Sequence, residues 1–134
     1  MTAVDTSVAV AAFASWHEQH PAAVASLSRG VRLIGHVALE TYAVLTRLPP
    51  PHRASASLVA EFLTRNFADP VLILPAREQR RLLATCAARN IKGGAVYDAL
   101  VAATAVHGGV TLVTLDLRAL ATYFSIGADV RVLR

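Results

Sequence analysis

Cysteine and lysine are nearly absent from this chain of 134 residues. Cys86 is the only cysteine, which excludes an internal disulfide and any metal cluster built from thiolates alone. Its apolar, helix-like surroundings predict a buried core position. Lys92 is the only lysine, so nearly all of the positive charge behind the net charge of +4 is arginine. Arginine pairs well with phosphate oxygens, so a polyanionic partner is compatible with this charge, although a biased codon pool would give the same composition.

Long apolar runs are also missing, although 54% of the residues are hydrophobic and only 16% are charged. The runs at 8–13 and 99–106 are too short to cross a bilayer. No basic stretch precedes the first run, as a secretory signal would require. We therefore expect a cytoplasmic protein that does not contact membranes. The length fits one domain over residues 1–134, and the apolar composition favours a sheet covered on both faces or a buried partner surface.

Short β-rich runs alternate with helical segments along the whole chain. Strands are expected at 2–5, 31–34, 71–74, 110–114 and 130–133, and helices at 8–16, 21–28, 36–48, 55–67, 76–90, 96–107 and 117–123. Three consecutive prolines at 49–51 predict the elbow of a helical hairpin over about residues 36–67. The alternation predicts a three-layer α/β/α fold with a central, mainly parallel twisted sheet of four to five strands. In such a sheet, ligands bind at the carboxyl ends of the strands.

Four of the nine carboxylates lie in strongly apolar surroundings, namely Asp5, Glu40, Asp98 and Asp116. Asp5 and Asp116 each follow a predicted strand, whereas Glu40 and Asp98 have apolar neighbours at helical spacing. Carboxylates drawn together toward a core repel one another, and a divalent cation removes that penalty. Oxygen ligands alone suit Mg²⁺ or Mn²⁺. Each acid also has an ordinary alternative role, as a helix cap, a first-turn acid or a residue at the edge of the core.

The segments around these acids resemble the four motifs of the PIN-domain family and occur in the same order. They are Val4-Asp5-Thr6-Ser7, Leu39-Glu40-Thr41-Tyr42, the run from Tyr97 to Ala105 around Asp98, and Thr114-Leu115-Asp116-Leu117-Arg118. The motifs extend over nearly the whole chain, and its length and small domain plan are similar to those of VapC toxins from type II toxin–antitoxin systems. Many relatives carry a further acid just after the fourth motif, where this chain has Leu117, Arg118 and Ala119. This departure predicts fewer metal ligands and leaves a second metal ion in doubt.

The resemblance implies an endoribonuclease that hydrolyses RNA phosphodiester bonds, in transfer or ribosomal RNA, with water activated by Mg²⁺ or Mn²⁺. All four acids are candidate catalytic residues, and Asp5, Asp98 and Asp116 are candidate metal ligands. Glu40 or Asp116 could instead hold the water or act as a base. The hydroxyls of Thr6, Ser7 and Thr114 are suited to orienting the carboxylates or touching the scissile phosphate, although turn formation is their more common role.

The resemblance also implies two protein partners, a second copy of the chain in a homodimer and a small VapB-like antitoxin in a hetero-oligomer. The antitoxin tail would occupy the acidic groove, where its arginine could compete with the metal. An apolar face on the predicted hairpin is our candidate antitoxin surface, formed by Val44, Leu48, Leu58 and Phe62. The same residues would equally well form an ordinary core.

Three other interpretations compete with a metal-dependent nuclease. The first is a catalytically inert PIN-like module that binds RNA or protein. The second is a receiver-like signalling domain, which is disfavoured because Pro75 stands where an acid is needed and Lys92 is the only lysine. The third is metal-free histidine catalysis, disfavoured because the histidines lie mostly near predicted helix ends without an evident partner. These are His17, His20, His36, His52 and His107.

Overall fold

The computed structural model describes residues 1–28 and 30–134, without the side chains of residues 68 and 69. Its described strands form one sheet in the order β3-β2-β1-β4-β5, and every neighbouring pair is parallel. The strands are β1 Thr2–Val4, β2 Arg32–Ile34, β3 Ala68–Leu72, β4 Thr111–Thr114 and β5 Val130–Val132. The predicted parallel sheet is therefore confirmed, at the upper end of the expected strand number.

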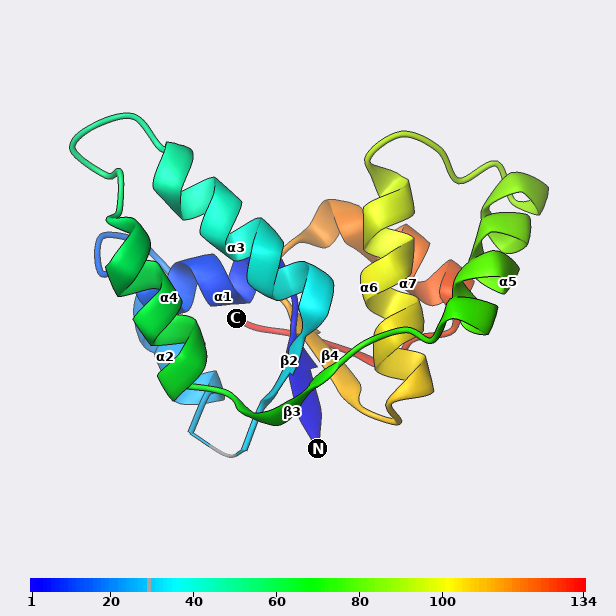
Figure 1. Ribbon diagram of the computed structural model, residues 1–134, viewed down its shortest axis with the longest axis horizontal. Helices are drawn as coiled ribbons and strands as arrows, with labels where there is room; N and C mark the ends of the chain where they lie inside the picture. The colour runs from blue at the N-terminus through cyan, green and yellow to red at the C-terminus, as the bar shows by residue number, and fades with distance from the viewer. Residues whose placement is uncertain (29) are drawn as a thin grey trace.

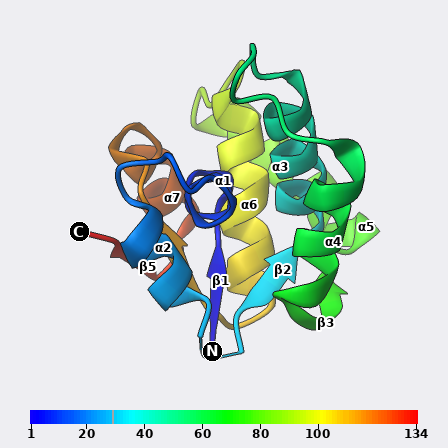
Figure 2. The same cartoon turned by 90° about the vertical axis from the view of Figure 1, so that its left-hand side faces the viewer.

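Helices cover both faces of this sheet, which completes the three layers. They are α1 Thr6–Phe13, α2 His20–Ser26, α3 Gly35–Arg47, α4 Ala56–Arg65, α5 Ala76–Ala88, α6 Ala95–His107, the 3₁₀ helix η1 Leu117–Ala119 and α7 Leu120–Ile126. Figure 1 shows α1 to α4 on one side of the sheet and α5 to α7 on the other, and Figure 2 shows α1 and α2 toward the viewer with α6 behind β1. The predicted hairpin is confirmed, because α3 and α4 pack together and the prolines lie between them.

The third strand begins earlier than the β-rich run at 71–74 predicts. It spans Ala68–Leu72 and pairs with β2 on one side only, as an edge strand. An edge strand tolerates Pro70, which cannot donate a ladder hydrogen bond. Ile73 and Leu74 leave the sheet, and Leu74 is buried instead in a small cluster beneath α5.

The first helix ends at Phe13 instead of continuing to Trp16. The backbone of Ala14 is extended, and the next residues form a separate turn in which the N–H of His17 donates to the carbonyl of Ala14 at 2.9 Å. The ring of Phe13 packs edge-on against Phe62 of α4, with 5.4 Å between the centroids, which fixes the end of α1. Trp16 therefore lies in a loop.

The core has two parts. The larger lies between the sheet and its helices, and its fully buried side chains are mainly aliphatic, including Val4, Val8, Ile34, Val37, Leu112 and Val113. Burying such a side chain stabilises the fold by about 1.5–3 kcal/mol. The smaller part joins α5 to α6 and contains Cys86, which is 3% exposed and confirms its predicted core position. None of the described helices has both the length and the apolar character that crossing a bilayer requires.

Candidate active site

Asp5 is the most enclosed of the four predicted acids, with 3% of its surface exposed. It follows β1 and caps α1, where its Oδ1 accepts a hydrogen bond from the backbone N–H of Val8 at 3.3 Å. Its own N–H donates to the carbonyl of Val113 on the neighbouring strand β4 at 3.0 Å. Because β1 and β4 run parallel, the ends of both strands lie at the same edge of the sheet, as the rule for ligand sites in such folds requires.

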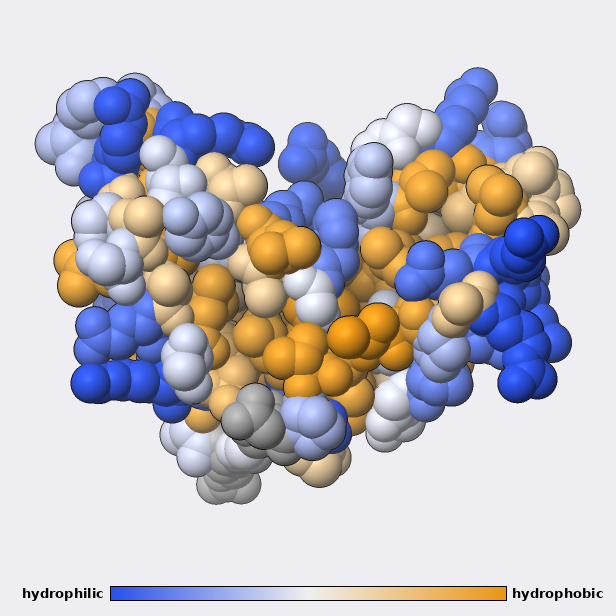
Figure 3. All heavy atoms as spheres, viewed as in Figure 1, coloured by the Kyte–Doolittle hydropathy of each residue, from blue (hydrophilic) through white to orange (hydrophobic). Residues whose placement is uncertain are grey.

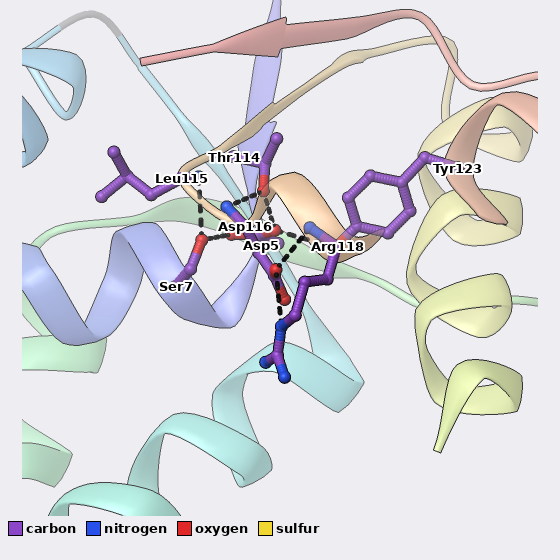
Figure 4. Close-up of polar contacts among 7 residues, drawn as sticks. All are labelled: Asp5, Ser7, Thr114, Leu115, Asp116, Arg118 and Tyr123. Carbon is purple, nitrogen blue, oxygen red and sulfur yellow. Dashed lines mark hydrogen bonds and ion pairs between the residues drawn. The ribbon is translucent and has the colours of Figure 1, made fainter. Parts of the chain in front are cut away.

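Three hydroxyls converge on the Asp5 carboxylate (Figure 4). Ser7 donates to Oδ1, whereas Thr114 and Tyr123 donate to Oδ2, the tyrosine at 2.8 Å. Burial raises the pKa of Asp5 and outweighs these hydrogen bonds, which lower it. With the N–H of Val8, each carboxylate oxygen accepts two hydrogen bonds, which is about the capacity of an ionised carboxyl group. The side chain of Asp5 is therefore fixed in orientation by the protein itself.

Tyr123 is 2% exposed, and burial together with the charge of Asp5 raises the pKa of its phenol far above the ordinary value. The phenol is therefore a protonated donor at neutral pH. Tyr123 lies on α7, 118 residues after Asp5 in the chain. It was not predicted, because nothing in the sequence marks this tyrosine as different from an ordinary core aromatic.

Asp116 lies just beyond β4 and caps η1, accepting a hydrogen bond from the N–H of Arg118 at 3.0 Å. Its own N–H donates to the hydroxyl of Thr114 at 2.9 Å, and the N–H of Leu115 donates to the hydroxyl of Ser7 at the same distance. Ser7 and Thr114 thus each connect the Asp5 carboxylate to the segment that carries Asp116. A role for the two hydroxyls in orienting these carboxylates stays a prediction.

Arg118 lies in the segment where many members of the family that the motifs resemble carry a further acid, and it brings a positive charge there instead. Its Nε lies 3.6 Å from Oδ1 of Asp116, and its side chain is 95% exposed (Figure 4). An ion pair this open to water is worth at most about 1 kcal/mol. Its importance is electrostatic, because a positive charge stands at the rim of the acidic site.

Glu40 projects from α3 and accepts a hydrogen bond from the hydroxyl of Thr6, which opens α1. Its other oxygen lies 4.0 Å from Nε2 of His36, one turn earlier on the same helix. The ring of His36 stacks on Tyr97 of α6, with a centroid distance of 5.2 Å and an angle of 5° between the planes. This contact does not follow from the sequence pattern, because it depends on how α3 packs against α6.

Asp98 lies in the first turn of α6, and its pKa is raised above the ordinary value. Burial is the larger cause, followed by the negative charges of Asp116, Glu40 and Asp5, while Arg118 acts in the opposite direction. Each of the other three acids is therefore near enough to repel the Asp98 carboxylate. Residues that are up to 111 positions apart in the sequence share one electrostatic environment.

All four acids line one open cleft of about 1090 Å³, together with Thr6 and Ser7. A cleft of this size exceeds the needs of a single ion and can admit part of a polymer. His17 also lines it, whereas the other histidines are not part of its described wall. The structure thus brings together the residues that the four motifs predicted.

The donor set fits a hard divalent cation, because it consists of carboxylate and hydroxyl oxygens and because a cation would relieve the repulsion at Asp98. Within the described residues, however, no three His, Cys, Asp or Glu side chains are close enough together to form a ready-made metal site. Asp5 is held by four donors, so closure around a cation requires rotation of the less constrained Asp98 and Asp116 side chains.

The four residues of the candidate antitoxin surface do not share one environment. Val44 lines the acidic cleft, and Leu58 is 58% exposed on α4. Phe62 packs edge-on against Phe13 and Phe67 and leans on the main core. Leu48 is half-buried at the end of α3. Phe62 therefore contributes to the fold, and only part of the predicted face is open to a partner.

Comparison with known proteins agrees with this geometry. The family model described as the PIN domain matches residues 2–124. Ribonuclease VapC40 of Mycobacterium tuberculosis, from strains CDC 1551 and H37Rv, is 50% identical over 132 residues, covering 98% of both chains. Ribonuclease VapC27 of the same organism is 46% identical over 131 residues, covering 97% of this chain and 95% of its own. The chain therefore belongs to the PIN-domain family and, within it, to the VapC group.

Proposed function

We propose that the protein is the toxin of a type II toxin–antitoxin system and acts as a Mg²⁺- or Mn²⁺-dependent endoribonuclease. The observation that carries the proposal is that Asp5, Glu40, Asp98 and Asp116 line one cleft, where the charges of the other three acids add to burial in raising the pKa of Asp98. Carboxylates gathered in this way repel one another unless a cation lies between them, and oxygen ligands suit Mg²⁺ or Mn²⁺. The ribonuclease names of the similar proteins support the same activity.

Asp5, Asp98 and Asp116 are the proposed metal ligands, with Asp5 exchanging one of its four hydrogen bonds for the cation, and Glu40 positions or deprotonates the attacking water. When bound, the cation lowers the pKa of water and neutralises charge on the phosphate oxygens. Thr6 holds Glu40, while Ser7 and Thr114 hold Asp5, so that these two acids keep their orientation as the substrate enters. Arg118 stands at the rim, where it can pair with a phosphate oxygen of the RNA in place of Asp116.

The proposed substrate is transfer or ribosomal RNA, cut within an accessible loop. Unpaired nucleotides can be splayed into an open cleft, whereas the deep major groove of an RNA duplex hides its bases. The net charge of +4 attracts the polyanion as a whole, even though the cleft itself is acidic. A divalent cation in the cleft would neutralise the negative charge there, so that the cleft would no longer repel the RNA that the positive net charge attracts.

A VapB-like antitoxin and a second copy of the chain are the proposed protein partners, in the cytoplasm. Exposed apolar side chains surround the first half of α3, including Leu39 at 75% and Ile73 at 68% exposed. Val71 and Ile73 lie close to Gly35 at the start of α3, and Tyr97 stacks on His36, the next residue of that helix. Figure 3 shows an apolar band across the middle of this face, between two more polar flanks. Such a patch fits a homodimer interface.

Cleavage of a fluorogenic RNA tests the nuclease directly. We expect activity with Mg²⁺ or Mn²⁺, none in EDTA, and recovery when the metal is returned. Asp98→Asn should abolish cleavage, because losing one such electrostatic contact costs at least about 3 kcal/mol in the barrier. Arg65→Gln, a change on the exposed end of α4 outside the cleft, is the matched control. Full activity of Asp98→Asn would refute the proposed metal site. No activity of the wild type with either metal would refute the nuclease and favour an inert PIN-like binding module.

A further inference from the structure

Two loops at one end of the helical layer are joined by an aromatic contact. One loop connects α1 to α2 and carries Trp16, and the other connects α3 to α4 and carries His52. Their rings lie 4.2 Å apart between centroids with an angle of 34° between planes. Trp16 is nevertheless 49% exposed, and His52 is also exposed. A large aromatic ring is thus held in place while about half of it remains in water.

Each loop is held by its own backbone hydrogen bonds. In the first loop the N–H of His20 donates to the carbonyl of His17 at 3.0 Å. In the second, the N–H of His52 donates to Pro49, and the N–H of Ala54 donates to Leu45 at 3.0 Å. The shape of both loops is therefore maintained independently of the ring contact. Core stability does not account for keeping a half-exposed tryptophan at this position.

The aromatic pair adjoins the acidic cleft through His17. The ring of His17 lies 6.0 Å from that of Trp16, and His17 lines the same cleft as the four acids. Its Nδ1 accepts a hydrogen bond from the N–H of Gln19 at 3.0 Å, so in the neutral ring the proton resides on Nε2. That N–H is available as a donor toward a molecule in the cleft.

Basic side chains accompany the pair. Arg53 follows His52 directly and is exposed, while its Nε donates to the carbonyl of Leu48 at 2.9 Å. Arg47, in the last turn of α3, is exposed as well. An aromatic surface with adjacent arginines is the combination that binds single-stranded nucleic acid, because bases stack on the rings and phosphates pair with the guanidinium groups.

We propose that Trp16 and His52 form a stacking platform for an unpaired base of the RNA that enters the cleft. The inference rests on the proposed ribonuclease function and specifies its substrate as a single-stranded or looped segment that extends beyond the metal site toward the proline loop. Stacking is tolerant of base identity, so the platform binds and positions RNA without reading its sequence. An antitoxin peptide is the competing occupant. The neighbouring arginines, Arg47 and Arg53, would repel such a peptide only if it were also basic.

Trp16 is the only tryptophan in the chain, so its intrinsic fluorescence reports on the platform alone. The full-length Asp98→Asn variant is titrated with a short uridine-rich single strand and with a duplex of matched length, and binding is followed in parallel by the anisotropy of labelled RNA. We expect the single strand to quench the emission and the duplex to leave it nearly unchanged. His52→Ala, made in the same background, should weaken binding of the single strand about tenfold, which is the scale of one lost base stack.

Kinetics of the active enzyme provide a second measurement. Trp16→Ala should raise KM for a looped RNA about tenfold and leave kcat nearly unchanged, whereas Trp16→Phe should keep most of the affinity. His107→Ala is the matched control, because this exposed histidine ends α6 outside the acidic cleft. Thermal unfolding identifies any variant that fails to fold, and if Trp16→Ala does not fold, the expected tenfold loss in His52→Ala remains as the test.

The outcomes separate the platform from the nuclease. RNA binding by anisotropy without any change in Trp16 emission overturns the platform while metal-dependent cleavage can still stand. If the single strand quenches Trp16 emission but the wild type does not cleave RNA with either metal, the platform is supported and the nuclease is refuted. An unchanged KM for Trp16→Ala also overturns the platform, as does quenching by an antitoxin peptide but not by RNA.

Discussion

Replacing Asp98 by asparagine should stabilise the metal-free protein although it destroys the metal site. Burial and the charges of Asp116, Glu40 and Asp5 raise the pKa of Asp98, so its ionised form is disfavoured in the folded state. An acid with a raised folded-state pKa adds most stability when protonated, and this advantage is lost as the pH rises from its unfolded-state pKa through its folded-state pKa. At neutral pH the wild type therefore carries an uncompensated penalty that Asp98→Asn removes.

The expected gain is on the order of 1 kcal/mol, the scale of repulsion between partly solvated like charges several ångströms apart. In a domain of this size that corresponds to a rise in Tm of about 4 °C. Thermal unfolding in EDTA measures it at pH 7, and the difference between variant and wild type should shrink as the pH falls toward 4, because Asp98 is then protonated. Leu83→Gln, on the exposed face of α5, is a matched surface control.

Saturating Mg²⁺ should reverse the order of stability. A ligand present at about a hundred times its Kd stabilises the folded state by about 2.7 kcal/mol, and the wild type should gain this while Asp98→Asn gains little. The reasoning fails if Asp98→Asn is less stable than the wild type in EDTA, or if its gain does not change with pH.

Three further predictions follow from neighbouring contacts. Tyr123→Phe removes a hydrogen bond to the buried Asp5 carboxylate, so urea unfolding should show a loss of about 1.5–3 kcal/mol in the free energy of unfolding. The same change raises the pKa of Asp5 further, so cleavage should increase with pH at a higher pH than in the wild type. Arg118→Ala should tighten Mn²⁺ binding a few-fold at low salt with Tm nearly unchanged, and weaker binding in a Mn²⁺ titration would contradict this. Ile73→Asp should convert a dimer to a monomer in light scattering at unchanged Tm, and a persistent dimer would exclude this face.

The parts of the fold that follow from local pattern were predictable. Alternating strand and helix signals required a parallel sheet, and the strand-end rule placed Asp5 and Asp116 at one edge. Helical spacing predicted that Glu40 and Asp98 lie on the core-facing sides of their helices, and both line the cleft that contains Asp5 and Asp116. These inferences needed only the period of each element and the order of elements in the chain.

The parts that depend on how elements pack against one another were not predictable. The Tyr123 hydroxyl reaches Asp5 only because α7 lies against the edge of the sheet at one particular rotation. The stack of His36 on Tyr97 depends in the same way on the packing of α3 against α6. The start of β3 was misplaced because Val71 to Leu74 has stronger β propensity than residues 68–70, with which the strand begins.

Asp116 shows that capping a helix and serving a metal site are compatible roles for one carboxylate. Its Oδ1 accepts the N–H of Arg118 and so caps η1, and the same contact holds the side chain at the wall of the cleft. Asn is as good a cap as Asp but lacks the charge, whereas Ala loses both properties. Asp116→Asn should therefore keep or slightly gain stability, because it retains the cap and removes a charge that repels Asp98, and it should lose metal-dependent cleavage. Asp116→Ala should lose cleavage and, relative to Asp116→Asn, about 1 kcal/mol in urea unfolding. The same pair of substitutions at Asp5 would be less informative, because an amide nitrogen there would face hydroxyls that now donate to the carboxylate. Equal stability of the two Asp116 variants would show that the cap has no energetic role, and cleavage by Asp116→Asn would remove this residue from the metal site.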